Sequence, residues 1–198
     1  MIDLDNISNE PPFEKFKQVY KAASQSNQAN IEAICISSFC NNSNEVNSRF
    51  VNLKIINDQD FIFFTNYESV KSLEFEKHKQ ISVALFWNNT NVQVRMKANI
   101  HKADKKLNNE YFSRRSKEKN ALALSSNQSR DISSFKEVIK NYKNSLKNDN
   151  LAVCPDYWGG FIFNPYSFEF WEGNEFRLNE RHLYIKKDNE WVNRILQP

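Results

Sequence analysis

The sequence is short of the residues from which several common functional sites are built. Its 198 residues include only three glycines, three cysteines and three histidines. No glycine-rich phosphate loop or dinucleotide-binding fingerprint is therefore present. The histidines, His78, His101 and His182, lie far apart and have no cysteine or carboxylate at ligand spacing. We expect no metal site.

The cysteines and the apolar segments also limit where the protein can work. Cys35, Cys40 and Cys154 are odd in number and lack the paired spacing of a redox or zinc motif. A reducing cytosol is the simplest interpretation. No apolar run approaches the roughly 20 residues that span a bilayer, and the polar, acidic start "MIDLDNISNE" is unlike a signal peptide. We therefore expect a cytoplasmic protein with no membrane partner.

Charge is modest, whereas aromatic residues are abundant. The net charge of +3 is too small for a protein whose main partner is a nucleic acid, and the most basic segment, "RRSKEK", is interrupted by a glutamate. Sixteen phenylalanines and a hydrophobic fraction of 40% are enough to build a core packed with rings. We expect one domain over residues 1–198, with residues 1–12 as a flexible lead.

The periodicity predicts a mainly β protein with flanking helices. Helical spacing appears in residues 11–25, 68–79 and, with a polar break at "SSNQSRDISS", 105–147. Short strands at hairpin spacing are predicted for residues 31–39, 48–56, 60–66, 81–87, 91–100, 159–165, 167–173, 181–187 and 190–196. This arrangement favours a closed antiparallel barrel with helices as insertions.

One segment, "FIFFTNYESVKS", combines a buried strand, a turn and the start of a helix. Ser69 is a candidate N-cap, and Lys71 falls in the first helical turn. Backbone amides, the hydroxyls of Thr65 and Ser69 and the charge of Lys71 would together suit a phosphate. Taken alone, however, the segment is more often an ordinary capped helix with a surface lysine.

Two further groups of residues could bind an anion or a ring. Tyr111, Arg115 and Lys119 are spaced four residues apart, so they would share one stripe of a helix that continued that far. Spacing alone favours a solvated basic face. In "FWEGNEFRLNER", Arg177 and Arg181 would share a face of a regular strand, although the overlapping segment "NERHL" can equally be a turn. Trp171 could lie near them or simply pack in the core.

Taken in order along the chain, these segments resemble the pyridoxine/pyridoxamine 5'-phosphate oxidase family. The motifs are "SRFVNLK", "FFTNYESVKS", "VQV", "EYFSRRS", "NQS", "FWEGNEFRLNER" and the ending "LQP", and the resemblance runs from about Phe13 to Pro198. It implies an FMN-binding split β-barrel. It also implies an FMN-dependent oxidase that converts pyridoxamine or pyridoxine 5'-phosphate to pyridoxal 5'-phosphate, with molecular oxygen as acceptor and hydrogen peroxide as product.

The resemblance also assigns a cofactor site. In it, Lys71 would hold the FMN phosphate, and Gln93 would hydrogen-bond the flavin ring. Gln128, Ser129, Trp171 and Arg181 would come from a second subunit, which implies a homodimer. The implied FMN-binding residues are Arg49, Phe50, Val51, Asn52, Leu53, Lys54, Phe64, Thr65, Lys71, Gln93, Gln128, Ser129, Trp171 and Arg181.

The same resemblance implies a site for a small phosphorylated pyridine substrate. Its residues would be Lys54, Tyr111, Arg115, Lys119, Arg177 and Asn179, and the last two would also be the catalytic residues. Arg49 and Lys54 are five residues apart, so a regular strand would point them to opposite faces. Both can serve one site only if the strand bends or the ligand wraps around its end.

The chain departs from the family pattern at four positions. Val70 replaces an arginine beside the phosphate-binding lysine, and Lys119 replaces a serine. Asn179 replaces a histidine and cannot become a cation, and Ile195 replaces an arginine. Two alternatives therefore stay open: a flavin oxidase of the same fold that acts on another substrate, such as a phenazine precursor, or a non-catalytic protein that binds FMN or pyridoxal phosphate.

Overall fold

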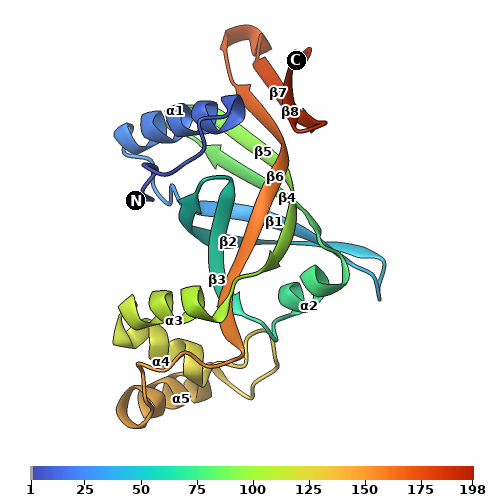
Figure 1. The fold of residues 1–198 in the computed structure, drawn as a ribbon. Helices are drawn as coiled ribbons and strands as arrows, with labels where there is room; N and C mark the ends of the chain where they lie inside the picture. Colours follow the sequence, from blue (N-terminus) through green and yellow to red (C-terminus); the bar gives the residue numbers. More distant parts are fainter. Residues whose placement is uncertain (1) are drawn as a thin grey trace.

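Six antiparallel strands form a closed barrel in the computed structural model, which describes residues 2–198. The strands follow the order β3-β2-β1-β4-β5-β6, and β3 also pairs with β6, which closes the barrel (Figure 1). Their bounds are β1 Ala33–Cys40, β2 Glu45–Asn57, β3 Asp60–Asn66, β4 Gln80–Trp87, β5 Val92–Lys102 and β6 Trp158–Glu172. The predicted mainly β architecture with flanking helices is confirmed.

The long strand β6 connects the barrel to a hairpin beyond it. One part of β6 pairs with β3, and the other part pairs with β7 (Glu180–Lys187), which in turn pairs with β8 (Glu190–Ile195). The prediction of two separate strands here is wrong, because the register against β5 shifts around Pro165 and the strand continues. Such a bulge lets a strand contain a proline without ending.

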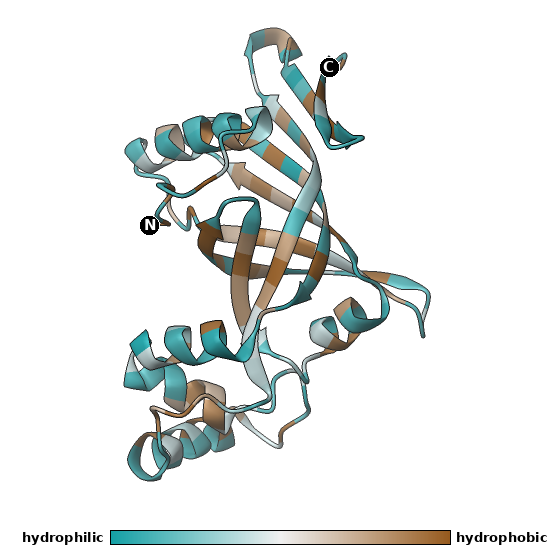
Figure 2. Ribbon diagram, in the orientation of Figure 1, coloured by the Kyte–Doolittle hydropathy of each residue, from teal (hydrophilic) through white to brown (hydrophobic). Residues whose placement is uncertain are grey.

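Aromatic rings fill the space between the barrel and helix α1 (Pro11–Gln25). The ring centres of Phe16 and Phe61 lie 5.3 Å apart, and those of Phe13 and Phe168 lie 5.1 Å apart. All four rings are fully buried, and burying each one contributes about 1.5 to 3 kcal/mol. Helix α1 thus lies at one end of the barrel (Figure 1). The barrel strands carry most of the residues of the buried core, and their apolar segments are visible in Figure 2.

The described part of the expected flexible lead packs against this core. Ile2, Leu4 and Ile7 are buried, and Ile7 forms a parallel bridge with Asp58. Burial of these apolar side chains favours packing of the segment, although its overall composition is polar. The first residue of the lead, Met1, lies outside the described residues.

Four further helices of the described chain are inserted between barrel strands. Helix α2 (Val70–Lys77) lies between β3 and β4, and α3 (Lys105–Arg114), α4 (Lys117–Ser125) and α5 (Phe135–Asn148) lie between β5 and β6. The last three lie together at the end of the barrel opposite α1 (Figure 1). Within residues 2–198, no helix has the length and apolar character needed to cross a membrane.

Helix α3 stops sooner than the sequence pattern predicted. Arg115 has extended backbone, and Ser116 begins α4 as its N-cap, where its hydroxyl accepts a hydrogen bond from the Lys119 amide. Tyr111, Arg115 and Lys119 therefore do not form a single helical stripe, because the helix does not continue as far as that stripe required. The N-cap hydrogen bond of Ser116 competes with continuation of α3.

A buried hydrogen-bonded joint attaches α3 to the barrel next to Gly159. The Asn108 side chain donates to the Tyr67 hydroxyl at 3.0 Å and accepts from the Gly160 amide at 2.8 Å, and the Tyr67 hydroxyl donates to the Gly160 carbonyl at 3.0 Å. A Cβ atom on Gly159 would lie 2.2 Å from the Tyr67 oxygen and 2.4 Å from the Asn108 nitrogen. The absence of a side chain at position 159 therefore permits this joint.

We expect Gly159→Ala to lower the free energy of unfolding by about 2 to 3 kcal/mol, since the added methyl group must displace a hydrogen-bonded network. Urea denaturation followed by circular dichroism measures this change. Gly160→Ala is the matched control, because its Cβ would meet its nearest atoms at 3.1 Å. Equal losses in the two variants would show that the joint does not constrain position 159.

Candidate functional site

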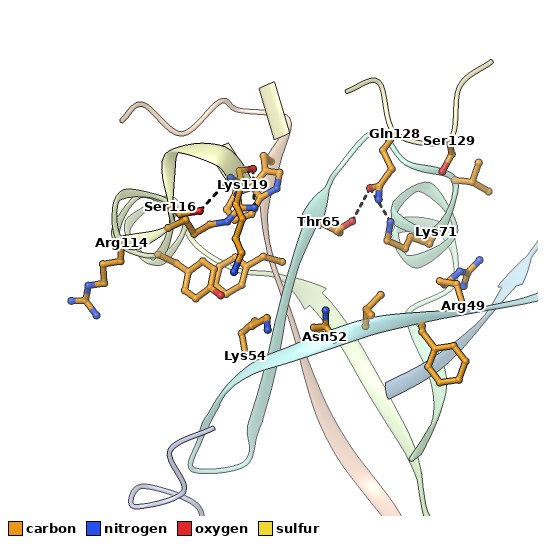
Figure 3. A pocket seen from close by; sticks show the side chains of 17 residues that line it. Arg49, Asn52, Lys54, Thr65, Lys71, Arg114, Ser116, Lys119, Gln128 and Ser129 are labelled. Carbon is orange, nitrogen blue, oxygen red and sulfur yellow. Dashed lines mark hydrogen bonds between the residues drawn. The ribbon is translucent and has the colours of Figure 1, made fainter. Parts of the chain in front are cut away.

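A cavity of about 740 Å³ lies between strands β2 and β3, the start of α2, the α3–α4 junction and the loop that holds Gln128 (Figure 3). Six of its lining residues are lysines or arginines, and none of those described is an aspartate or glutamate. The lining residues are Arg49, Phe50, Val51, Asn52, Lys54, Phe64, Thr65, Val70, Lys71, Tyr111, Arg114, Arg115, Ser116, Lys119, Gln128, Ser129 and Trp158. Such a surface is suited to an anionic ligand.

Lys71 lies buried at one end of the cavity. Its ammonium group donates to the Ser69 hydroxyl at 2.9 Å and to the Gln128 side-chain oxygen at 3.1 Å, and Thr65 donates to the same Gln128 oxygen at 3.0 Å (Figure 3). These acceptors are neutral. Burial, together with the nearby charge of Arg49, lowers the pKa of Lys71 to about 8. A bound anion would relieve this cost of burying a charge.

Ser69 occupies the predicted N-cap position of α2 but makes no side-chain cap hydrogen bond. Its hydroxyl is paired with the Ser72 hydroxyl at 2.9 Å and accepts from Lys71. Ser69 therefore helps to hold the lysine at the helix start.

Arg49 is held beside Lys71 by a buried carboxylate outside the lining. Its guanidinium lies 3.1 Å from Glu74, which also accepts hydrogen bonds from Ser38 and Asn47. Glu74 is only 4% exposed, and all of these partners are fixed in strands β1 and β2. The network orients Arg49, and Lys71 is left without a carboxylate partner among the hydrogen bonds found in the described chain.

A second cationic group lies at the other end of the cavity. The Tyr111 ring stacks on Phe64 with ring centres 3.7 Å apart, and the Arg115 guanidinium lies 4.4 Å from the centre of the Trp158 ring. One nitrogen of Arg115 donates to the Lys119 carbonyl at 3.1 Å, whereas Nη1 is buried and has no hydrogen-bond partner in the described residues. An unsatisfied buried donor of this kind marks a place for an anionic acceptor.

The α3–α4 break creates this second group. Because the chain turns at Arg115 and Ser116, Tyr111, Arg115 and Lys119 all line the cavity although they share no helical stripe. Arg114 lines it too and was not predicted, although its position beside Arg115 was a usable signal. No sequence signal distinguished Trp158 or Ser116 from an ordinary core or capping residue.

A bulge in β2 explains how Arg49 and Lys54 reach one cavity. The pairing of β2 with β3 shifts register between Leu53 and Ile55, so Lys54 is the extra residue. The bend that the five-residue spacing required is therefore present. Leu53, predicted as part of the cofactor site, is 1% exposed and belongs to the core.

The remaining predicted residues, Gln93, Trp171, Arg177, Asn179 and Arg181, do not line this cavity. Gln93 lies opposite Trp171 across β5 and β6, and Trp171 lies opposite Arg181 across β6 and β7. The predicted proximity of Trp171 and Arg181 is thus confirmed. Arg181 is anchored by Glu169 at 2.7 Å.

Arg177 and Arg181 do not share a strand, because β7 begins only at Glu180. Arg177 ends a short 3₁₀ turn, where it and Phe176 have positive φ angles of 61° and 55°. The Asn179 side chain accepts from the Asn174 amide at 3.3 Å and helps to close this exposed turn. A regular strand through both arginines is therefore wrong. The turn lies at residues 175–177, before the segment "NERHL" for which it was considered, and that segment enters β7 at Glu180.

Gln128 and Ser129 lie in the cavity of their own chain, where Gln128 bonds Thr65 and Lys71. The assignment of these two residues to a second subunit does not match this arrangement. The hydrogen bonds from Thr65 and Lys71 bring the loop after α4 onto the cavity.

Two family models match the chain. One, described as pyridoxamine 5'-phosphate oxidase, matches residues 21–143, and the other, described as the pyridoxine 5'-phosphate oxidase C-terminal dimerisation region, matches residues 158–198. The pyridoxine/pyridoxamine 5'-phosphate oxidase of Colwellia psychrerythraea is 31% identical over 96% of this chain and 88% of its own. That of Coxiella burnetii is 32% identical over 96% of each chain.

Solved structures share the fold. PhzG from Burkholderia lata, in complex with tetrahydrophenazine-1-carboxylic acid, has a TM-score of 0.90 at 22% identity and covers 96% of this chain and 93% of its own. A pyridoxamine 5'-phosphate oxidase-related, FMN-binding protein from Nostoc punctiforme has a TM-score of 0.79 at 12% identity, covering 96% and 99%. Together with the barrel topology, these similarities confirm the split-barrel fold.

The lowered pKa of Lys71 predicts how FMN affinity depends on pH. Below about pH 8 the lysine of the empty site is charged and can bind a phosphate dianion, which in turn raises its pKa. Affinity is therefore fully present below this pKa and is lost as the pH rises through it. We expect the FMN dissociation constant to increase about tenfold between pH 7 and pH 9 in a fluorescence titration.

Lys71→Arg is the matched control for this titration, because a guanidinium stays charged over the whole range. Its FMN affinity should be nearly constant between pH 7 and pH 9, whatever its absolute value. A similar decline in both proteins would mean that another group controls the pH dependence.

Proposed function

The chain belongs to the pyridoxine/pyridoxamine 5'-phosphate oxidase family, and we propose that it oxidises pyridoxamine or pyridoxine 5'-phosphate to pyridoxal 5'-phosphate with oxygen as acceptor. One observation carries the proposal beyond family membership. The cavity has two separate cationic ends, one at Lys71 and one at Tyr111 and Arg115. A phosphorylated cofactor and a phosphorylated substrate would each need such an end.

FMN is the cofactor, and the Lys71 end of the cavity fits its phosphate. A buried ammonium that meets only neutral acceptors, with Arg49 beside it, is chemically matched to a dianion. Thr65, Gln128 and Ser129 would complete the group that holds it. Val70 lines the cavity where the family pattern has an arginine, so one potential cation is absent from this end.

The substrate phosphate would be bound at the opposite end. The unpartnered Nη1 of Arg115, the hydroxyl of Tyr111 and the ammonium of Lys119 would donate to it. Stacking of Tyr111 on Phe64, and of the Arg115 guanidinium on Trp158, holds these donors in place. The Tyr111 and Arg115 donors are thus preorganised before the ligand binds.

When bound, FMN supplies hydride acceptance from the 4' carbon of the substrate and two-electron transfer to oxygen, which yields hydrogen peroxide. The residues of the chain bind, orient and polarise. With an alcohol substrate, loss of the hydroxyl proton accompanies loss of the hydride and leaves the aldehyde. With an amine substrate, water hydrolyses the resulting imine and ammonia leaves.

A homodimer would complete this site. Trp171, Arg177, Asn179 and Arg181 lie in the segment matched by the dimerisation-region model, and none of them lines the cavity of its own chain. In the proposed arrangement, the exposed turn with Arg177 and Asn179 reaches the pyridine ring held by the other chain. Gln93, Trp171 and Arg181, which form one cross-strand row, contact the flavin from there.

A same-fold oxidase of a phenazine precursor is the second candidate. The substitutions at Val70 and Asn179 and the fold similarity to PhzG favour it. The retained Lys54, Tyr111 and Arg115, together with Lys119, favour a phosphorylated ligand instead. A non-catalytic FMN- or pyridoxal phosphate-binding protein is the third candidate, and only the same two substitutions support it.

Anaerobic addition of pyridoxamine 5'-phosphate to the purified protein tests the proposal directly. We expect the flavin absorbance bands to bleach and to return when air is admitted, because hydride transfer reduces the flavin and oxygen reoxidises it. Pyridoxine 5'-phosphate is the parallel substrate. Bands that persist with both compounds would reject this reaction and favour another substrate or a binding role.

We further expect Arg177→Ala to lower turnover at least tenfold while FMN stays bound, since the proposed contact of Arg177 is with the substrate and not the cofactor. Steady-state kinetics and the flavin content of the purified variant measure the two effects. Lys187→Ala, which removes an exposed cation at the end of β7, is the control. Loss of flavin in step with activity would contradict the role of Arg177.

A further inference from the structure

Glu32 lies at the edge of the cavity, although it is not one of the lining residues. It directly precedes β1, and its backbone carbonyl accepts a hydrogen bond from the Leu53 amide at 2.9 Å. Its carboxylate lies 2.8 Å from the ammonium of Lys54, in the β2 bulge. The residue is therefore anchored through its backbone while its side chain ion-pairs with a lysine that lines the cavity.

The negative charge of Glu32 also affects the second cationic group. Burial raises the pKa of Tyr111, the charge of Arg115 lowers it, and the charge of Glu32 raises it further. The pKa of Glu32 itself is lowered: burial acts to raise it, but hydrogen bonds and nearby positive charge, with those of Lys54 among them, outweigh that effect. Glu32 is therefore ionised at neutral pH. Its negative charge is felt at Tyr111, one of the proposed donors to the substrate phosphate.

Before a ligand binds, Lys54 and Arg115 therefore differ in whether their donors are already used. The Arg115 Nη1 donor has no partner in the described chain, so a phosphate adds a hydrogen bond there without breaking one. Lys54 already holds a carboxylate. A phosphate that approaches Lys54 must share the ammonium group with the Glu32 carboxylate or displace that carboxylate. The two groups are both negative, so they repel each other when they bind the same ammonium.

We propose that Glu32 is an internal counter-ion that competes with the phosphate of the substrate for Lys54 and so sets the affinity of this end of the cavity. The inference rests on the proposed function for the identity of the ligand. Since substrate and product carry the same phosphate, the competition weakens both complexes alike. It therefore raises KM and favours product release without changing the chemical step.

Glu32→Gln is the decisive variant. An amide keeps the shape and can still accept a hydrogen bond from Lys54, but it carries no charge. FMN-loaded protein is titrated with inorganic phosphate, and binding is followed by tryptophan fluorescence, because Trp158 stacks with Arg115. We expect Glu32→Gln to bind phosphate about fivefold more tightly than the unchanged protein, the size expected for removing one nearby like charge.

Two further variants separate charge from shape. Glu76→Gln makes the same change in net charge at a glutamate that pairs with Lys102 and lies outside the cavity lining, and it should leave phosphate affinity unchanged. Glu32→Asp keeps the charge and should not tighten binding. Equal tightening in Glu32→Asp, unchanged binding in Glu32→Gln, or weaker binding in Glu32→Gln would each overturn the proposal, the last by showing that Glu32 only positions Lys54.

Kinetics then test the link to the reaction. With pyridoxamine 5'-phosphate, Glu32→Gln should lower KM about fivefold and should not raise kcat. If none of the proteins oxidises this compound, the proposed function fails, but the phosphate titration still decides whether Glu32 acts as a counter-ion. A KM that does not fall in an active Glu32→Gln enzyme would overturn the inference while leaving the proposed function intact.

Discussion

The site depends on buried cationic side chains that have no carboxylate partner in the described chain. Lys71 is 7% exposed and donates to neutral oxygens, and the buried Nη1 of Arg115 has no partner in the described chain. Burying such groups costs free energy unless an anion completes them. The folded chain can hold them in this state only because the surrounding barrel and aromatic core are stable enough to offset the cost.

Carboxylates beside the cavity neutralise some of its cations and not others. Glu74 pairs with Arg49 and Glu32 pairs with Lys54, so those two cations are partly neutralised. Lys71, Arg115 and Lys119 have no ion-pair partner among the salt bridges of the described residues. The two ends of the cavity can therefore respond differently to a ligand. Each has one cation that is already paired, but the Lys71 end has one further cation, whereas the opposite end has both Arg115 and Lys119.

Backbone irregularities place these charges. The β2 bulge turns Lys54 to the same cavity as Arg49, and the break between α3 and α4 turns Arg115 and Lys119 inward. The joint of Asn108, Tyr67 and Gly160 then holds α3 against β6. Regular strands and an unbroken helix would have pointed several of these side chains elsewhere.

The sequence by itself determined most of the local elements, because strand alternation and helical spacing depend on residues close together in the chain. The site residues were implied by the resemblance of its ordered motifs to a family, and thirteen of them line one cavity. Only the tertiary structure decided that β6 is one strand, that Glu32 meets Lys54, and that Trp171 and Arg177 lie away from the cavity of their own chain. Those outcomes depend on register, burial and pairing between distant segments, which no local pattern encodes.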